Sequence, residues 1–177
     1  MINLFIFFNK ARKKLLMIFL RKAFKKHGNN FVFDPYGNYS FNTIEVGDDV
    51  FFGLNSTILA SKSGVYFGNK IMLGPNVSII GGDHNTSIVG KYMIDVKDKL
   101  PENDLPIVIE DDVWVGCGVT ILKGVRIGTG SIIAAGALII KDVPKYSVVG
   151  GIPGRILKDR FNAEELIAHE KMINKKK

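Results

Sequence analysis

The sequence has one cysteine, one tryptophan and three histidines among its 177 residues. The single cysteine, Cys117, excludes an intramolecular disulfide and fits a reducing compartment. The longest apolar run near the N-terminus, residues 15–20, is far shorter than the roughly 20 residues that span a bilayer. Charge does not precede an apolar run there, and no small-residue cleavage site follows. We therefore expect neither a membrane-spanning helix nor a secretory signal in this region.

Acidic residues are missing from both ends of the sequence. Residues 1–28 hold eight Lys and Arg, residues 171–177 hold four Lys, and neither stretch contains Asp or Glu. The remaining residues, 29–170, have twelve Lys and Arg against all seventeen Asp and Glu. The formal net charge of +7 therefore belongs to the ends. The body has no basic patch interleaved with aromatic residues, so we expect no nucleic-acid partner.

The basic N-terminal segment predicts an amphipathic helix that ends at Gly28. One stripe of this helix is apolar: Phe8, Ala11, Leu15, Ile18 and Phe19. Two interpretations stay open and are compatible with each other. The stripe docks on the rest of the fold or on a neighbouring subunit, or residues 1–26 lie on an anionic membrane. In the second case each basic residue contributes about 1 kcal/mol to binding.

From Val46 onward, apolar residues recur with a period of six. The repeating positions are Val46, Phe52 and Ile58, then Phe67, Leu73 and Ile79, then Ile109, Val115, Ile121, Ile127, Ile133 and Ile139. This period fits short strands joined by tight turns, with three strands in each coil. Residues eighteen apart should then stack, Ile109 on Ile127 for example. A glycine often follows the apolar residue, and we expect it to accept the positive φ of a turn.

The segment "IEDDVWVGCGVTILKGVRIGTGSIIAAGALIIKDVPKYSVVGGIPGRIL" resembles the hexapeptide-repeat acyltransferases, and the resemblance extends over residues 40–158. It implies an all-β solenoid, a left-handed parallel β-helix, in a homotrimer with acetyl-CoA bound between subunits. The chain then divides into a basic helix at 1–28, the β-helix domain at 29–158 and a C-terminal helix and basic tail at 159–177. The stretch "GKYMIDVKDKLPEND" is most similar to the sugar and polysaccharide O-acetyltransferase branch.

The repeat is interrupted by an expected extruded loop at residues 80–106, which opens with "DHN". A loop of this length in a compact fold is usually functional or disordered. The resemblance places the general base of the family at His84. An imidazole that titrates near pH 6.5 is suited to removing the proton of an attacking sugar hydroxyl. The group that orients its ring stays open: Asp83, Asp95, Glu102 or a backbone carbonyl.

Two neighbours of the histidine, Asp83 and Asn85, are candidate ligands for the hydroxyl groups of the acceptor. Solvation of the loop is the alternative role for both side chains. A metal site of the three-histidine kind is not expected, because it needs three histidines and the coils contain His84 alone. We therefore expect no metal.

The turn after residue 114 is the expected site of the reactive thioester. Trp114 precedes an inward position and should face outward, and the resemblance places it in the donor cleft. The N–H groups around Gly116 and Cys117 are placed to bind the thioester carbonyl and its developing oxyanion. Relatives usually carry Ser or Ala where Cys117 stands. Because the family transfers the acyl group directly, we expect a small packed thiol there and no acyl-cysteine.

The C-terminal half of the resemblance supplies further candidate contacts to acetyl-CoA. Ala135 would contact the pantetheine arm through its backbone, Ile140 the adenine region and Lys141 a phosphate. Relatives often have Thr at the position of Ile140, so a hydroxyl contact is lost here. Arg155 and Lys158 are expected near the CoA phosphates, with solvated surface charge as the alternative role.

A second helix is expected after the coils, with Asn162 and Glu165 forming a capping box. We expect this helix to cover the open end of the coil and His169 to be exposed on it. The sequence as a whole predicts a cytoplasmic acetyl-CoA-dependent O-acetyltransferase for a sugar or surface-polysaccharide precursor. Its basic N-terminal segment, residues 1–26, would suit an enzyme at the inner membrane face. An N-acetyltransferase for a nucleotide-linked amino sugar and a non-catalytic β-helix scaffold are the alternatives.

Overall fold

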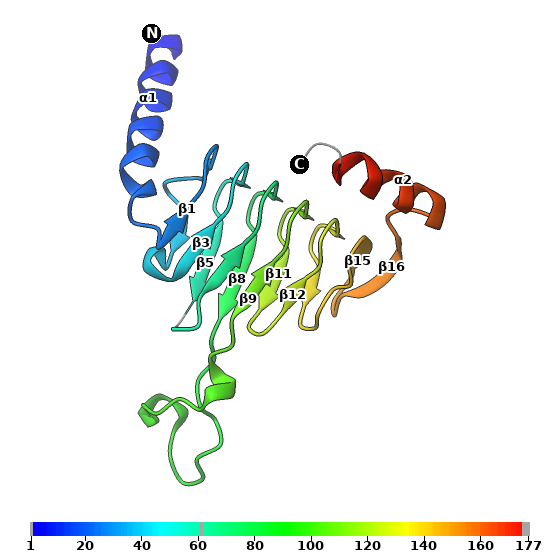
Figure 1. Cartoon of the computed structure of the whole chain (residues 1–177). Helices are drawn as coiled ribbons and strands as arrows, with labels where there is room; N and C mark the ends of the chain where they lie inside the picture. The colour runs from blue at the N-terminus through cyan, green and yellow to red at the C-terminus, as the bar shows by residue number, and fades with distance from the viewer. Residues whose placement is uncertain (1, 61, 175–177) are drawn as a thin grey trace.

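The computed structural model describes residues 2–60 and 62–174. It is a coiled array of short strands with a helix at each end (Figure 1). The helices are α1 (Ile2–Arg21), α2 (Ala163–Asn174) and the 3-10 turns η1 (Phe41–Thr43), η2 (Met93–Asp95) and η3 (Pro101–Asn103). The strands are β1 (Lys26–His27), β2 (Asn38–Tyr39), β3 (Ile44–Val46), β4 (Phe51–Phe52), β5 (Thr57–Ala60), β6 (Val65–Phe67), β7 (Met72–Leu73), β8 (Ser78–Gly81), β9 (Ile107–Ile109), β10 (Trp114–Val115), β11 (Thr120–Leu122), β12 (Arg126–Ile127), β13 (Ile132–Ile133), β14 (Leu138–Ile139), β15 (Ser147–Gly150) and β16 (Arg155–Asp159).

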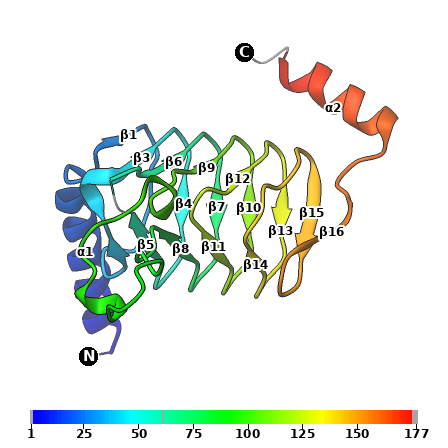
Figure 2. The ribbon, with the colours of Figure 1, turned by 90° about the horizontal axis from the view of Figure 1, so that it is seen from below.

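Successive strands fall into three sheets that run side by side along the coil (Figure 2). Sheet A has the order β1-β3-β6-β9-β12, sheet B β4-β7-β10-β13-β15 and sheet C β2-β5-β8-β11-β14, all parallel. β16 joins the end of sheet B antiparallel to β15. The register confirms the predicted stacking of residues eighteen apart: Ile109 beside Ile127, Val115 beside Ile133 and Ile121 beside Ile139. Period six therefore gave the correct register.

The inward residues form one continuous core, which changes character along the coil. Its later coils are filled by buried Ile and Val side chains. The first coils are filled by aromatic rings instead. Ring centroids lie 5.0 Å apart in the pairs Phe24–Phe31, Phe24–Phe33 and Phe31–Phe52. Full burial of one such ring stabilises the fold by about 1.5–3 kcal/mol. The N-terminal end of the coil is thus closed by aromatic packing.

The glycines that follow the inward residues have a different role from the one expected. Gly74 and Gly116 do not have positive φ; that conformation falls two residues later, at Asn76 (58°) and Gly118 (66°). What requires glycine is the approach of the next coil. A Cβ on Gly74 would lie 2.7 Å from the Cys117 nitrogen, closer than real Cβ contacts come. The missing side chain lets the backbones of two coils stack.

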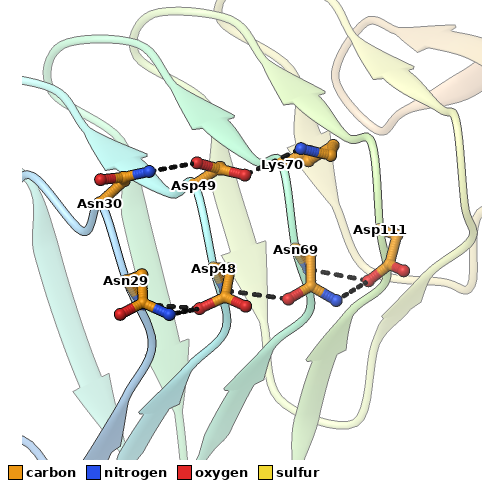
Figure 3. Close-up of polar contacts among 7 residues, drawn as sticks. All are labelled: Asn29, Asn30, Asp48, Asp49, Asn69, Lys70 and Asp111. Carbon is orange, nitrogen blue, oxygen red and sulfur yellow. Dashed lines mark hydrogen bonds and ion pairs between the residues drawn. The ribbon is translucent and has the colours of Figure 1, made fainter. Parts of the chain in front are cut away.

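The corner between sheets A and B carries a ladder of Asn and Asp side chains (Figure 3). The N–H of Asn29 donates to Asp48 Oδ1 at 2.6 Å. The N–H of Asp48 donates to Asn69 Oδ1 at 2.8 Å, and the N–H of Asn69 to Asp111 Oδ1 at 2.7 Å. The side chains of Asp48, Asn69 and Asp111 therefore each satisfy a backbone donor that the tight turn of the preceding coil leaves open.

α1 ends at Arg21, earlier than the predicted Gly28, because the chain turns there to bury Phe24. Met17 and Leu20 pack against the core from the opposite side to the predicted stripe. Four residues of that stripe are exposed: Phe8, Leu15, Ile18 and Phe19. Docking of the stripe on the rest of the same chain is therefore wrong.

α2 begins with the predicted capping box, in which Asn162 and Glu165 exchange two hydrogen bonds of 2.9 Å. The prediction that α2 covers the open end of the coil is wrong. Figure 1 shows α2 set off from the last coil, and its Glu170 lines a hollow beside the Asn–Asp ladder. His169 is half-buried rather than exposed, because its ring packs on Phe161 with centroids 4.6 Å apart.

Candidate active site

Residues 82–106 form no strand, and Figure 1 shows this segment leaving the coil between β8 and β9. Hydrogen bonds join its two legs at the base, where the N–H of Asp83 donates to the carbonyl of Asn103 at 2.7 Å. The carboxylate of Asp104 accepts from the N–H groups of Lys62 and Ser63 at 2.9 and 3.3 Å. These bonds fix the point at which the "DHN" sequence leaves sheet C.

Lys123, which follows β11 on the next coil, also joins the two legs. Its Nζ lies 3.0 Å from Asp83 Oδ2 and donates to the carbonyl oxygen of Glu102 at 2.6 Å. One ammonium group therefore contacts the outgoing and the returning leg together. Since Asp83 directly precedes His84, this contact constrains the backbone that carries the candidate base.

The ring of His84 is exposed, and no group among the described residues hydrogen-bonds to it. Within one chain none of the three expected carboxylates orients the ring. Asp83 is instead paired with Lys123. Both ring nitrogens are therefore without a hydrogen-bond partner among the described residues, and the role of His84 as base stays a prediction.

Asn85 is buried, unlike the two residues before it. Its Oδ1 accepts hydrogen bonds from the N–H of Ser87 at 3.0 Å and from the Ser87 hydroxyl at 2.8 Å. This pair of bonds forms a local turn of the kind that Asn side chains favour. Asn85 thus orders the start of the loop, and its contact with an acceptor stays a prediction.

The outer face of sheet B carries an apolar column that runs across four strands. Phe51, Met72, Trp114 and Ile132 are neighbours in register on β4, β7, β10 and β13. The Trp114 side chain is 51% exposed, which confirms that it faces outward. Phe51 and Met72 are exposed as well, and Ile132 is half-buried. A row of largely exposed apolar side chains on one face of a sheet is a typical contact surface.

At the corner between sheets B and C, side chains bond the turns only in the first coils, where the N–H of Asn55 donates to Asp34 Oδ2 at 3.0 Å. Two residues after the inward position, the later coils have no counterpart of the Asn–Asp ladder. The stacked positions hold Pro75, Cys117 and Ala135, none of which carries an acceptor oxygen. Among the described residues no group accepts the N–H of Cys117 or Ala135. The neighbouring N–H of Gly116 is occupied by the carbonyl of Ile133 at 2.8 Å. Two backbone donors, one coil apart, are therefore available at this corner.

Cys117 itself differs from expectation, because its side chain is exposed and not packed. The corner position points the side chain away from the core, whereas the inward position two residues earlier belongs to Val115. A thiol at this corner is therefore in contact with solvent in the isolated chain.

The remaining candidate contacts lie toward the C-terminal end of the coil. The N–H of Gly154 donates to the carbonyl of Leu138 at 2.7 Å, which ties the segment before β16 to β14. Exposed near this junction are Ile140, Lys141, Arg155 and Lys158. Three cationic side chains are thus presented to solvent on adjoining segments.

Within one chain the candidate base and the candidate donor groups do not meet. His84 leaves the corner between sheets C and A, whereas Trp114 and Cys117 lie on sheet B and at the corner between sheets B and C. Sheet C separates the two sets of residues. A site that contains both sets requires a second chain.

Comparisons with known proteins support this description of the coil. The model for bacterial transferase hexapeptide (six repeats) matches residues 106–141, and the model for the hexapeptide repeat of succinyl-transferase matches residues 43–80. A structure of a hexapeptide-repeat acetyltransferase from Vibrio cholerae, complexed with acetyl coenzyme A, is 30% identical with a TM-score of 0.72. The match covers 86% of this chain and 79% of the other. The chain belongs to the hexapeptide-repeat acetyltransferases.

Other members of this family are similar over most of the chain. A galactoside O-acetyltransferase from Lactococcus lactis is 34% identical over 139 residues, which cover 77% of this chain and 64% of that one. A maltose O-acetyltransferase from Clostridium difficile is 25% identical with a TM-score of 0.71, covering 86% and 84% of the two chains. The chain spans somewhat less than two thirds of the length of the curated relatives that it matches first. The left-handed β-helix of these acetyltransferases accounts for the three parallel sheets.

Sequence reasoning missed Lys123 as a contact of the loop. Nothing in the repeat distinguishes this lysine from other turn lysines, because the loop legs that it joins are twenty and forty residues away. The backbone N–H groups of Cys117 and Ala135, which have no acceptor among the described residues, could have been found from a weak pattern in the sequence. Positions two after an inward residue carry Asp, Asn or Thr at one corner and Leu, Pro, Cys or Ala at the other.

Proposed function

We propose that the chain transfers an acetyl group from acetyl-CoA to a hydroxyl of a sugar or surface-polysaccharide precursor, with His84 as the general base. The observation that carries this proposal is the exposed, unpartnered ring of His84 at the base of a hydrogen-bonded loop. The names of the galactoside and maltose O-acetyltransferases support a sugar hydroxyl as acceptor.

In this reaction the acceptor oxygen attacks the thioester carbonyl carbon while His84 takes its proton. The oxyanion that develops accepts hydrogen bonds from the N–H groups of Cys117 and Ala135, which have no protein acceptor in the described chain. The carbon–sulfur bond then breaks, and the departing CoA sulfur takes up the proton as a thiol. No acyl-enzyme forms, so the exposed Cys117 thiol takes no covalent part.

The site is proposed to form between subunits of a homotrimer. The separation of His84 from Trp114 by sheet C supports a site made by two chains. The exposed apolar column of sheet B and the exposed Val89 and Tyr92 of the loop offer surfaces for such contacts. In the donor cleft Trp114 and Ile140 would line the arm and adenine of acetyl-CoA. Its phosphates would be bound by Lys141, Arg155 and Lys158.

The acceptor is proposed to bind beside the loop, with Asp83 and Asn85 at its entrance. An acceptor carried on a lipid would be presented at the inner face of a membrane. The basic α1 would hold the enzyme close to such an acceptor. An amino sugar as acceptor is the rival. An amine is a better nucleophile than a hydroxyl and needs less help from a base.

The deciding experiment is thiol release from acetyl-CoA over a panel of sugars, sugar nucleotides, amino sugars and glycan fragments. We expect turnover with a hydroxyl acceptor, and His84→Ala should lower its rate by about 10²–10⁴-fold. His27→Ala is the matched control, because His27 is an exposed histidine outside the site. Equal turnover by wild type and His84→Ala contradicts the assigned base. Turnover with amino sugars alone favours N-transfer.

A further inference from the structure

α1 has two faces, and the coil holds only one of them. Lys13 Nζ lies 2.9 Å from Oδ1 of Asp34, a carboxylate that is 4% exposed. Four residues later Met17, and three after that Leu20, pack against the core. Arg21 Nη2 donates to the carbonyl of Phe31 at 2.6 Å. These contacts fix the rotation of the helix about its own axis.

The fixed rotation turns the apolar stripe outward. Phe8, Leu15 and Phe19 are seven and four residues apart, so they share one side of a helix with 3.6 residues per turn. Their side chains are 61%, 68% and 82% exposed. The helix cannot bury them on its own coil without breaking the contacts of Lys13 and Met17 on the other side. A stripe of this size calls for an apolar partner outside the chain.

Cations border this stripe. By helical geometry Arg12 lies along one edge of it and Lys14 along the other, and the exposed Lys22 directly follows the last residue of α1. Among the described residues, Lys10, Lys14 and Lys22 have no acidic partner, whereas Lys13 is paired with Asp34. Residues 1–28 contain no Asp or Glu at all. The face therefore combines an apolar centre with uncompensated positive charge.

We propose that this face of α1 is a docking surface for an anionic lipid bilayer. Apolar side chains would enter the boundary between headgroups and acyl chains, while the long basic side chains reach the phosphates. A second copy of the same face is a poor partner, since it would bring two sets of unpaired cations together. In a closed cyclic oligomer, moreover, all copies of α1 lie at the same height along the axis, which favours binding to one surface. The inference does not depend on the transferase activity.

Among the described residues, no helix is long and apolar enough to cross a bilayer.

The test measures partition of the full chain into vesicles of phosphatidylglycerol and phosphatidylcholine in equal parts. Vesicles of phosphatidylcholine alone serve as the comparison. We expect at least about tenfold stronger binding to the anionic vesicles at about 0.1 M salt, and weaker binding at higher salt. Lys14→Gln with Lys22→Gln should lower it about 30-fold, at roughly one kilocalorie per charge. Phe8→Ser with Phe19→Ser should lower it at least about tenfold.

The matched control is Ile167→Ser with Met172→Ser, which removes exposed apolar side chains from α2 at the other end of the chain. This variant should bind vesicles as the wild type does. Circular dichroism and sedimentation establish that each variant keeps its helices and its oligomeric state. Equal binding to both kinds of vesicle, or an equal loss in the α2 variant, overturns the proposal. So does an absence of vesicle binding while the α1 variants dissociate the oligomer, because the stripe is then a contact between copies.

Discussion

Lys123 Nζ lies 3.0 Å from Asp83 Oδ2, one residue before His84, and also holds the carbonyl of Glu102. The lysine therefore stands where the loop leaves the coil and where it returns. It does not touch the ring of His84. We regard it as a positioning residue, because it restrains the backbone from which the candidate base projects.

Lys123→Met should lower kcat for acetyl transfer by about 10–100-fold, since small displacements of a catalytic group are costly. The KM for acetyl-CoA should change little, because the donor residues lie across sheet C. Lys123→Arg keeps the positive charge and should restore most of the activity. Steady-state kinetics of the three proteins provide the measurement. If Arg fails as completely as Met, or if only KM rises, Lys123 does not act by positioning the loop.

The coil was predictable from the sequence because its period is local. One inward residue in six fixes the strands, and equal spacing fixes which strands pair, as Ile109 and Ile127 demonstrate. The separation of His84 from Trp114 was not predictable from the period alone. It depends on which sheet or corner of the coil each residue occupies.

Exposure was predicted less well than register. The alternation of inward and outward residues along a strand correctly predicted that Trp114 faces outward. It does not predict the exposure of residues at the corners, and Cys117 was expected to be packed but is exposed. The apolar stripe of α1 was found correctly, but the sequence left open whether it faces the coil or an outside partner. That direction depends on Lys13 reaching the buried Asp34, a contact between distant positions.

Cys117→Pro should test the open backbone donor without altering the turn. Pro75 occupies the stacked position one coil earlier and also follows a glycine, so proline is compatible with this corner. The substitution removes the N–H, and loss of one oxyanion donor typically costs about 10²–10³-fold in kcat. Cys117→Ala keeps the N–H and should remain near wild type. If Cys117→Ala loses as much activity as Cys117→Pro, the thiol matters and the backbone donor does not.

Gly116→Ala should destabilise the coil. A Cβ at this position would lie 2.6 Å from the Ala135 nitrogen and 2.9 Å from the Ile133 carbonyl oxygen. Both contacts are backbone atoms, so two coils must move apart, at a cost of about 1–3 kcal/mol. Thermal unfolding provides the measurement, with Cys117→Ala as the neighbouring control. An unchanged melting temperature would mean that the coils separate here without strain.

The docking of α1 should weaken in acid, because it depends on a charged Asp34. Burial alone would raise the pKa of Asp34, but the Asn55 N–H and the Lys13 ammonium outweigh it and hold that pKa below its ordinary value. A carboxyl group with a lowered pKa contributes stability above its unfolded pKa of about 3.9, and this is lost as the pH falls through the folded value. Limited proteolysis of α1 and thermal unfolding, measured from neutral pH downward, should therefore detect release of the helix below about pH 4. Asp34→Asn should be less stable at neutral pH and lack this part of the acid dependence. An equal loss of stability in acid for both proteins would assign the effect to other carboxylates.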